Sequence, residues 1–207
     1  MHARTLVLLL SLWLSYGLAW AETVLVTGLA GRVNVADPAS SLHPFARLKA
    51  GQRLALESDA RLQIVYLGSG RHETWSGPGR LDIGAGDSRS GDLPAPRVRQ
   101  LPPDVLAQLA KTPQPEGGAL PRRQRSLPHT DAVGKIEATY RQMRIDAAAD
   151  DLEPELYLLS GMFELRQLER VEEVILDIMQ KRPADPQAKL LASLYRKSLK
   201  NLRESGK

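Results

Sequence analysis

The sequence predicts an α+β protein with three parts: a small antiparallel β-sandwich or roll domain, a proline-rich linker, and a C-terminal α-helical hairpin domain of repeat-like character. Three observations predict it. Apolar and polar residues alternate over residues 22–90, proline and arginine dominate 91–129, and apolar residues recur at steps of three and four over 130–207. A period of two is typical of half-buried strands, and a period near 3.6 is typical of helices.

Residues 1–21 have the organisation of a secretory signal peptide. A short positive start precedes the almost wholly apolar run 6–18, and residues 19–21 (Ala-Trp-Ala) form the small-x-small pattern that signal peptidase reads. The alternative is an uncleaved membrane anchor, but a spanning helix needs roughly 20 apolar residues. We therefore expect cleavage between Ala21 and Glu22, and no stable membrane span in the mature chain.

Cysteine content and net charge restrict the function further. The chain has no cysteine, which excludes disulfides, thiolate metal sites and a lipidated cysteine, and suits a bacterial periplasm. Its formal net charge is only +4, which does not favour a nucleic-acid partner. Arginines do gather in the linker, either as solvated residues or as contacts with an anionic surface. They are Arg97, Arg99, Arg122, Arg123 and Arg125.

The region 22–90 is expected to contain about six short strands. Val33 and Val35 share one face of a strand, and so do Leu62 and Ile64. Strict alternation indicates one buried face for each strand, as in an antiparallel sheet packed on one side. Glycines lie between the runs, where turns need positive φ.

Three consecutive segments of this region carry a family pattern. They are Gly31-x-Val33-x-Val35, then Leu48-x-x-Gly51-x-x-Leu54-x-Leu56, then Ala60-x-Leu62-x-Ile64-x-Tyr66. This pattern resembles a FecR-type domain over roughly residues 24–83, and an unrelated β-sandwich is the alternative. The resemblance implies a small extracytoplasmic β module without catalytic residues. In the signalling members of that family, an inner-membrane protein relays the occupancy of an outer-membrane transporter to a sigma factor. Few residues precede the apolar run here, so we expect no cytoplasmic anti-sigma segment.

Proline density in 91–129 disfavours both helices and central strands, and predicts a semi-rigid spacer. One short helix is possible within 101–111. Pro102 and Pro103 suit its start, and Val105, Leu106 and Leu109 give it an apolar edge.

Four helices are expected after residue 130. Their apolar positions include Val133, Ile136, Tyr140 and Met143 in the first, Leu156, Leu159 and Phe163 in the second, Val171, Val174, Ile175 and Ile178 in the third, and Leu191, Leu194, Tyr195 and Leu202 in the fourth. The second is apolar almost all round, which predicts a buried position. Asp185 followed by Pro186 predicts the start of the fourth.

The second and third helices form a predicted hairpin. Val174, Ile178 and Pro186 fall at three marked positions of a tetratricopeptide repeat, and Gly161 lies one residue before the usual glycine. The hairpin thus resembles a degenerate tetratricopeptide unit, and a plain helical bundle is the equal alternative. Either arrangement leaves a helical face suited to protein contact or self-association.

One dense cluster of functional side chains follows Gly70. Tyr66, Arg71 and Trp75 are the candidate platform for a sugar ring or a peptide, and the alternative places Trp75 in the β core. His72 and Glu73 are adjacent on a strand and point to opposite faces, so they are not expected to form a catalytic dyad.

The sequence carries no recognised catalytic or metal-binding motif. We therefore expect a non-enzymatic periplasmic binding or adaptor protein of the bacterial cell envelope, without a cofactor, that contacts an envelope protein or cell-wall material. Two alternatives are a membrane-anchored signalling regulator and a wall-glycan enzyme. The enzyme requires two carboxylates about 5 to 9.5 Å apart, such as Glu73 and Asp82 facing each other across a groove.

Overall fold

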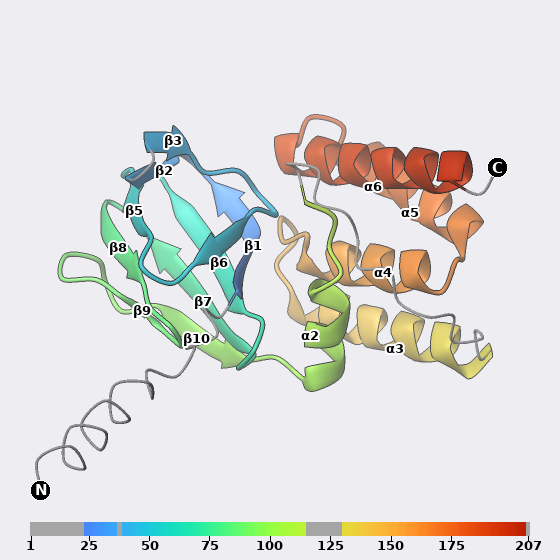
Figure 1. Cartoon of the computed structure of the whole chain (residues 1–207), viewed down its shortest axis with the longest axis horizontal. Coiled ribbons are helices and arrows are strands. Elements are labelled where there is room, and N and C mark those ends of the chain that lie inside the picture. Colours follow the sequence, from blue (N-terminus) through green and yellow to red (C-terminus); the bar gives the residue numbers. More distant parts are fainter. Residues whose placement is uncertain (1–22, 37–38, 115–129, 206–207) are drawn as a thin grey trace, which may run out of the picture.

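The computed structural model describes residues 23–36, 39–114 and 130–205, and every structural statement below concerns these residues. It confirms the α+β class: two five-stranded antiparallel sheets form a sandwich, and a set of helices packs beside it (Figure 1). The expected signal peptide and its cleavage site lie outside the described residues.

The sandwich contains all of the described strands. They are β1 (Thr23–Ala30), β2 (Val33–Ala36), β3 (Ala39–Ser41), β4 (Arg47–Lys49), β5 (Arg53–Leu56), β6 (Arg61–Tyr66), β7 (Arg71–Ser76), β8 (Gly79–Ile83), β9 (Ser88–Arg89) and β10 (Arg97–Gln100). One sheet has the order β10-β7-β6-β1-β4 and faces the helices. We call it the inner sheet, and the other, β3-β2-β5-β8-β9, the outer sheet.

The expectation of one buried face per strand is right for the central strands of the outer sheet and wrong for the central strands of the inner one. In the outer sheet, Leu54 and Leu56 are buried while Arg53 and Ala55 are exposed. In the inner sheet, four successive residues of β1, from Val24 to Thr27, have no exposed surface. Both faces of β1 are covered because the helices pack on the side that points away from the sandwich interior.

A glycine with positive φ makes the turn from β1 to β2. Gly31 has φ +69°, and a Cβ there would lie 2.8 Å from the Cα of Ala60. Both the left-handed conformation and the close backbone approach require glycine. This is the first glycine of the FecR-like pattern.

The proposed linker is wrong for its first half. Arg97–Gln100 forms β10, which pairs antiparallel with Arg71–Thr74 at the edge of the inner sheet. The short helix expected within 101–111 is confirmed as α2 (Pro103–Leu109). The prolines do not interrupt β10, because Pro96 and Pro102 lie on either side of it and a strand interior disfavours proline. Residues 115–129 lie outside the described part of the chain.

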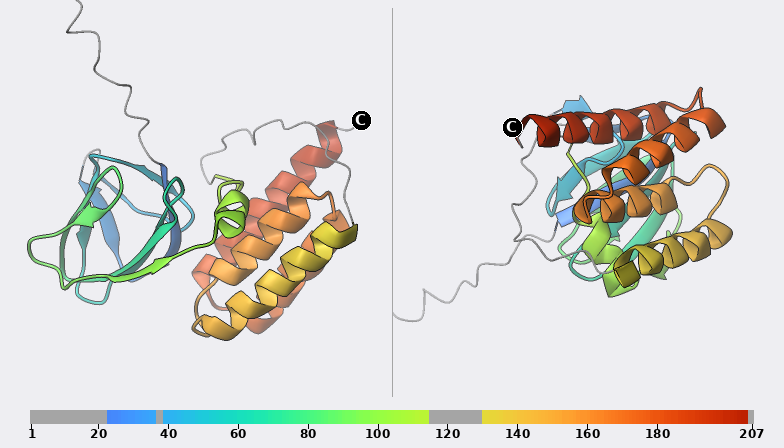
Figure 2. Two further views of the ribbon diagram at one scale, coloured as in Figure 1. Left: turned by 90° about the horizontal axis from the view of Figure 1, so that it is seen from below. Right: turned by 90° about the vertical axis from the view of Figure 1, so that its right-hand side faces the viewer.

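The four helices expected after residue 130 are confirmed. They are α3 (Thr130–Asp146), α4 (Glu153–Glu164), α5 (Leu168–Lys181) and α6 (Pro186–Ser205). They lie side by side in a row (Figure 2). Asp185 caps α6 as expected, since its Oδ1 accepts a hydrogen bond of 2.8 Å from the Gln187 amide. The central α4 is buried from Glu153 to Met162, as its all-round apolar sequence predicts.

The helices and the inner sheet share one hydrophobic core. Leu25 and Val65 on the sheet belong to the same cluster as Leu106 of α2 and Leu156 of α4. A second cluster fills the sandwich between the two sheets. The shared core joins the β region and the helices, and α2, from the region predicted as a linker, is part of that core.

Candidate functional site

The aromatic residues of the predicted platform lie inside the sandwich. Tyr66 is fully buried and Trp75 is 3% exposed, so the two rings belong to the core between the sheets. The Tyr66 hydroxyl lies 2.8 Å from Ser88 Oγ, and burial raises the pKa of Tyr66 to about 12. A surface platform of Tyr66, Arg71 and Trp75 is therefore not formed, and the alternative that placed Trp75 in the core describes the structure.

A buried carboxylate organises this cluster. Glu73 has no exposed surface and accepts hydrogen bonds from Arg71 Nε, Trp75 Nε1 (2.9 Å) and the Ser88 amide (3.3 Å). Such bonds offset the cost of burying a charge. Asp82 is exposed on the outer sheet, so the two carboxylates do not face each other across a groove as the glycan-enzyme hypothesis requires.

His72 points the other way, to the junction between the inner sheet and the helices. Its Nδ1 accepts a hydrogen bond of 3.2 Å from Arg99 Nε, so the ring proton lies on Nε2. Nε2 lies 3.1 Å from Glu153 Oε2, in close contact but without hydrogen-bond angles. Arg99 Nη2 also donates a 2.7 Å bond to Glu153 Oε1. We call these three residues the junction cluster.

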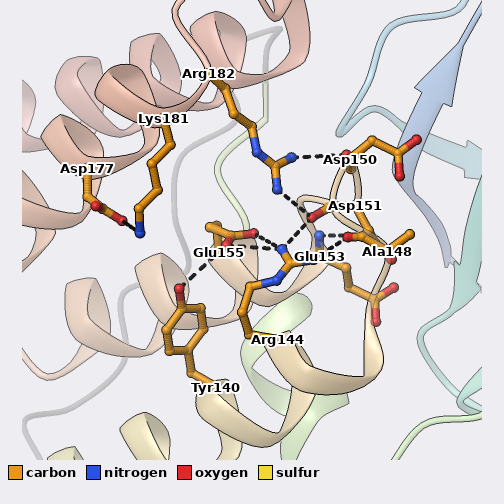
Figure 3. A network of polar contacts seen from close by, with 10 residues as sticks. All are labelled: Tyr140, Arg144, Ala148, Asp150, Asp151, Glu153, Glu155, Asp177, Lys181 and Arg182. Atoms are coloured by element: carbon orange, nitrogen blue, oxygen red, sulfur yellow. Dashed lines mark hydrogen bonds and ion pairs between the residues drawn. The ribbon is translucent and has the colours of Figure 1, made fainter.

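The loop before Glu153 is held by arginines from two helices (Figure 3). Arg144 of α3 donates to the Asp151 carbonyl at 2.7 Å and reaches both carboxylate oxygens of Glu155. Arg182, just after α5, donates to the Asp150 carbonyl at 3.0 Å. These bonds fix the start of α4, and with it the position of Glu153 against the sheet.

The junction shifts the pKa values of Glu153 and Asp151 in opposite directions. Burial acts to raise the pKa of Glu153, but His72, Arg99 and the Thr27 hydroxyl outweigh it and hold the pKa below its ordinary value. Burial raises the pKa of Asp151, and the nearby charge of Glu153 raises it further. Glu153 is thus the carboxylate that the junction keeps ionised.

The junction cluster leaves no room for a substrate. His72 is 2% exposed and Glu153 is fully buried. The adjacent cleft, lined in part by Gln63, Asp151 and Gln187, has a volume of about 30 Å³, far below the 300 Å³ or more typical of ligand sites. The cluster therefore fixes the sheet to the helices.

A much larger groove lies on the face of α5 and α6. It has a volume of about 550 Å³. Its apolar part consists of Ile175, Leu176 and Leu199, of which Leu176 is 63% exposed. Leu176 extends the apolar surface of Ile175 and Leu199 to the solvent within a groove, which makes this face the candidate contact surface of the described residues. We call this feature the α5–α6 groove.

Charged residues line the rim of the α5–α6 groove. The cations are Arg196, Lys200 and Arg203, and the anions are Glu172 and Glu204. Arg203 Nη2 bonds Glu172 Oε1 at 2.6 Å, and Lys200 Nζ lies 3.9 Å from Glu204 Oε1. Both carboxylates therefore have a cation beside them within the groove, and the rim carries one more cation than anion.

The described residues hold no group of three or more histidine, cysteine or acidic side chains that could bind a metal ion. None of the described helices is both long and apolar enough to cross a membrane.

The sequence analysis predicted neither the junction cluster nor the α5–α6 groove as a site. Arg99 and Glu153 are 54 positions apart, and Arg99 was assigned to a linker. One signal was available, because the unbroken apolar run at the start of β1 is typical of a sheet buried on both faces. The α5–α6 groove was foreseen only as an unpaired helical face.

No family model, curated protein or solved structure matches the chain, so the likeness to FecR-type and tetratricopeptide units stays a prediction from the residues quoted above.

Proposed function

We propose that this chain is an exported, non-enzymatic binding protein of the bacterial cell envelope, and that it docks a protein partner through the α5–α6 groove. The groove carries the proposal. It combines an exposed leucine, buried apolar neighbours and a charged rim, the composition of a protein-contact patch with an apolar centre and a polar edge.

Export is supported by the sequence of residues 1–21. The FecR-like pattern of residues 24–83 supports an extracytoplasmic β module as the other binding part of the protein. Cell-wall material or another envelope protein is the proposed contact of that part.

The junction between the two halves supports an adaptor. The Arg99–Glu153 ion pair (2.7 Å), the Leu29 amide bond to Gln187 Oε1 (2.9 Å) and the Arg47 bond to the Ala110 carbonyl (2.6 Å) all link sheet residues to helical ones. An adaptor needs its binding faces at a fixed separation. These contacts hold the α5–α6 groove at a fixed separation from the sandwich.

Site-specific photo-crosslinking in the native envelope tests the proposal. A photoreactive residue replaces Leu176 in the groove, and the matched control replaces Ile145 of α3, which is 77% exposed. We expect a discrete adduct with one envelope protein from position 176 and none from position 145. Equal labelling from both positions, or no adduct at position 176, would overturn the proposed docking face.

A further inference from the structure

We infer that the occupant of the α5–α6 groove is a single amphipathic helix with acidic flanks, which extends the row of helices by one. This inference rests on the proposed function and names the partner's chemistry. It draws on the packing of the row, the spacing of the groove residues and their charge.

Each helix of the row touches the next helix and the one after it. Consecutive helices pack from α3 to α6. In addition, Arg170 of α5 pairs with Glu137 of α3 at 3.1 Å, and Tyr195 of α6 bonds Ser160 of α4. A helix placed after α6 in the same pattern touches both α6 and α5.

The groove is on the side of α5 where that next helix belongs. Arg170 points to α3, whereas Glu172 lines the groove. Two residues along a helix are about 200° apart around its axis. The groove therefore lies across α5 from α3, which is the open end of the row.

The groove residues of α6 follow one helical face. Arg196, Leu199, Lys200 and Arg203 recur at steps of three, one and three, and Glu204 follows at the edge of the groove. From Arg196 to Glu204 they extend about 12 Å along the axis, just over two turns. A surface of this shape matches the apolar stripe of a partner helix with anchors at i, i+3 or i+4, and i+7.

The charge of the rim selects the flanks of that helix. Glu172 and Glu204 already have cations beside them in the groove, and Arg196 has no ion pair among the described residues. An acidic side chain on the occupant completes the pairing of Arg196. A second copy of this face would instead add a second surplus of cations, so self-association through two grooves is disfavoured.

Synthetic helical peptides test the inference against the full chain. The probe carries leucines at i, i+4 and i+7 with glutamate on both flanks, and its control has lysine in place of each glutamate. Fluorescence anisotropy measures the binding of each at low salt. We expect the glutamate peptide to bind at least about fivefold more tightly, because glutamate can pair with Arg196 whereas lysine meets the surplus cation of the rim.

Two variants assign the binding to the groove. Leu176→Asp should reduce the affinity for the glutamate peptide by about tenfold or more, as the loss of a central apolar anchor does. Arg196→Glu should shift the preference toward the lysine peptide. Both residues lie at the surface, and an unchanged thermal midpoint will verify that each variant is folded.

Each contrary outcome has its own meaning. Equal binding of the two peptides overturns the acidic flank, and binding that Leu176→Asp does not change overturns the groove as the site. A dimer seen by sedimentation and lost in Leu176→Asp identifies a second copy as the occupant and overturns the inference. A crosslinked partner at position 176 without peptide binding would support the proposed docking face but overturn the inference that its occupant is a helix.

Discussion

Replacing Glu153 by glutamine should destabilise the whole chain, because this residue is the only carboxylate of the junction cluster. Glu153 is fully buried and lies 2.7 Å from Arg99 and 3.1 Å from His72. Removing one partner of a buried pair costs about 3–5 kcal/mol. Arg99 is 46% exposed, so water can solvate its freed guanidinium. We therefore expect a loss of about 2 kcal/mol in the free energy of unfolding.

Urea unfolding at pH 7 measures this loss. Far-UV circular dichroism follows the helices, and fluorescence of Trp75, in protein expressed from Glu22 onward, follows the sandwich. The matched control is Glu169→Gln, because Glu169 also lies in the first turn of a helix but is exposed. That control should change stability by less than about 0.5 kcal/mol. Because the helices and the inner sheet share a core, the two signals should change at the same urea concentration.

The stabilisation that Glu153 contributes should decrease as the pH falls. The folded pKa of Glu153 lies below its unfolded value of about 4.3, so its contribution is fully present above that value and disappears as the pH falls through the folded pKa. The difference between wild type and Glu153→Gln should therefore shrink in acid. A variant that matches wild-type stability at pH 7, or two signals that change separately, would refute the reasoning.

Three further predictions concern single positions. Asp151→Asn should stabilise the chain at neutral pH. The raised folded pKa disfavours the charged form, and the effect should be absent well below pH 3.9, as urea midpoints across that range will show. Gly161→Ala should change the free energy of unfolding in urea by less than about 1 kcal/mol, because the helix propensity gained by alanine offsets the contact of the new Cβ 2.8 Å from Ile136 Cδ1, and Ile136→Val in the same chain should turn the change into a net gain. Trp75→Phe should cost about 3 kcal/mol in urea unfolding by circular dichroism, because it shrinks a core ring and removes a donor from the buried Glu73; a loss below 1 kcal/mol would mean that this bond contributes little.

The sequence predicts the helices better than the sheets. Helix signals are local: the cap at Asp185, the step pattern of α5 and the all-round apolar α4 each lie within one segment. Sheet pairing is not local. β10 is four residues long and all four are exposed, so its only reason to be a strand is the partner β7. No pattern within residues 97–100 indicates it.

The platform prediction was wrong for a related reason. Tyr66, Arg71 and Trp75 are close in sequence and carry functional groups, which makes them look like a site. Strand alternation instead directs Trp75 and Glu73 into the sandwich, where the carboxylate uses the indole and guanidinium as donors. The several functional side chains in this short segment therefore supply the hydrogen bonds of a buried carboxylate and do not form an exposed site.

Burial on both faces of β7 connects these observations. His72 and Glu73 are neighbours, are both buried, and point in opposite directions, so each face of the inner sheet contains a polar group that needs a partner. Within the sandwich the partners are close in sequence, whereas across the junction they come from β10 and α4. The cost of leaving either group unpaired ties the helices to the sheet in one arrangement. The orientation of the α5–α6 groove relative to the sandwich thus depends on a histidine in one half of the chain and a glutamate in the other.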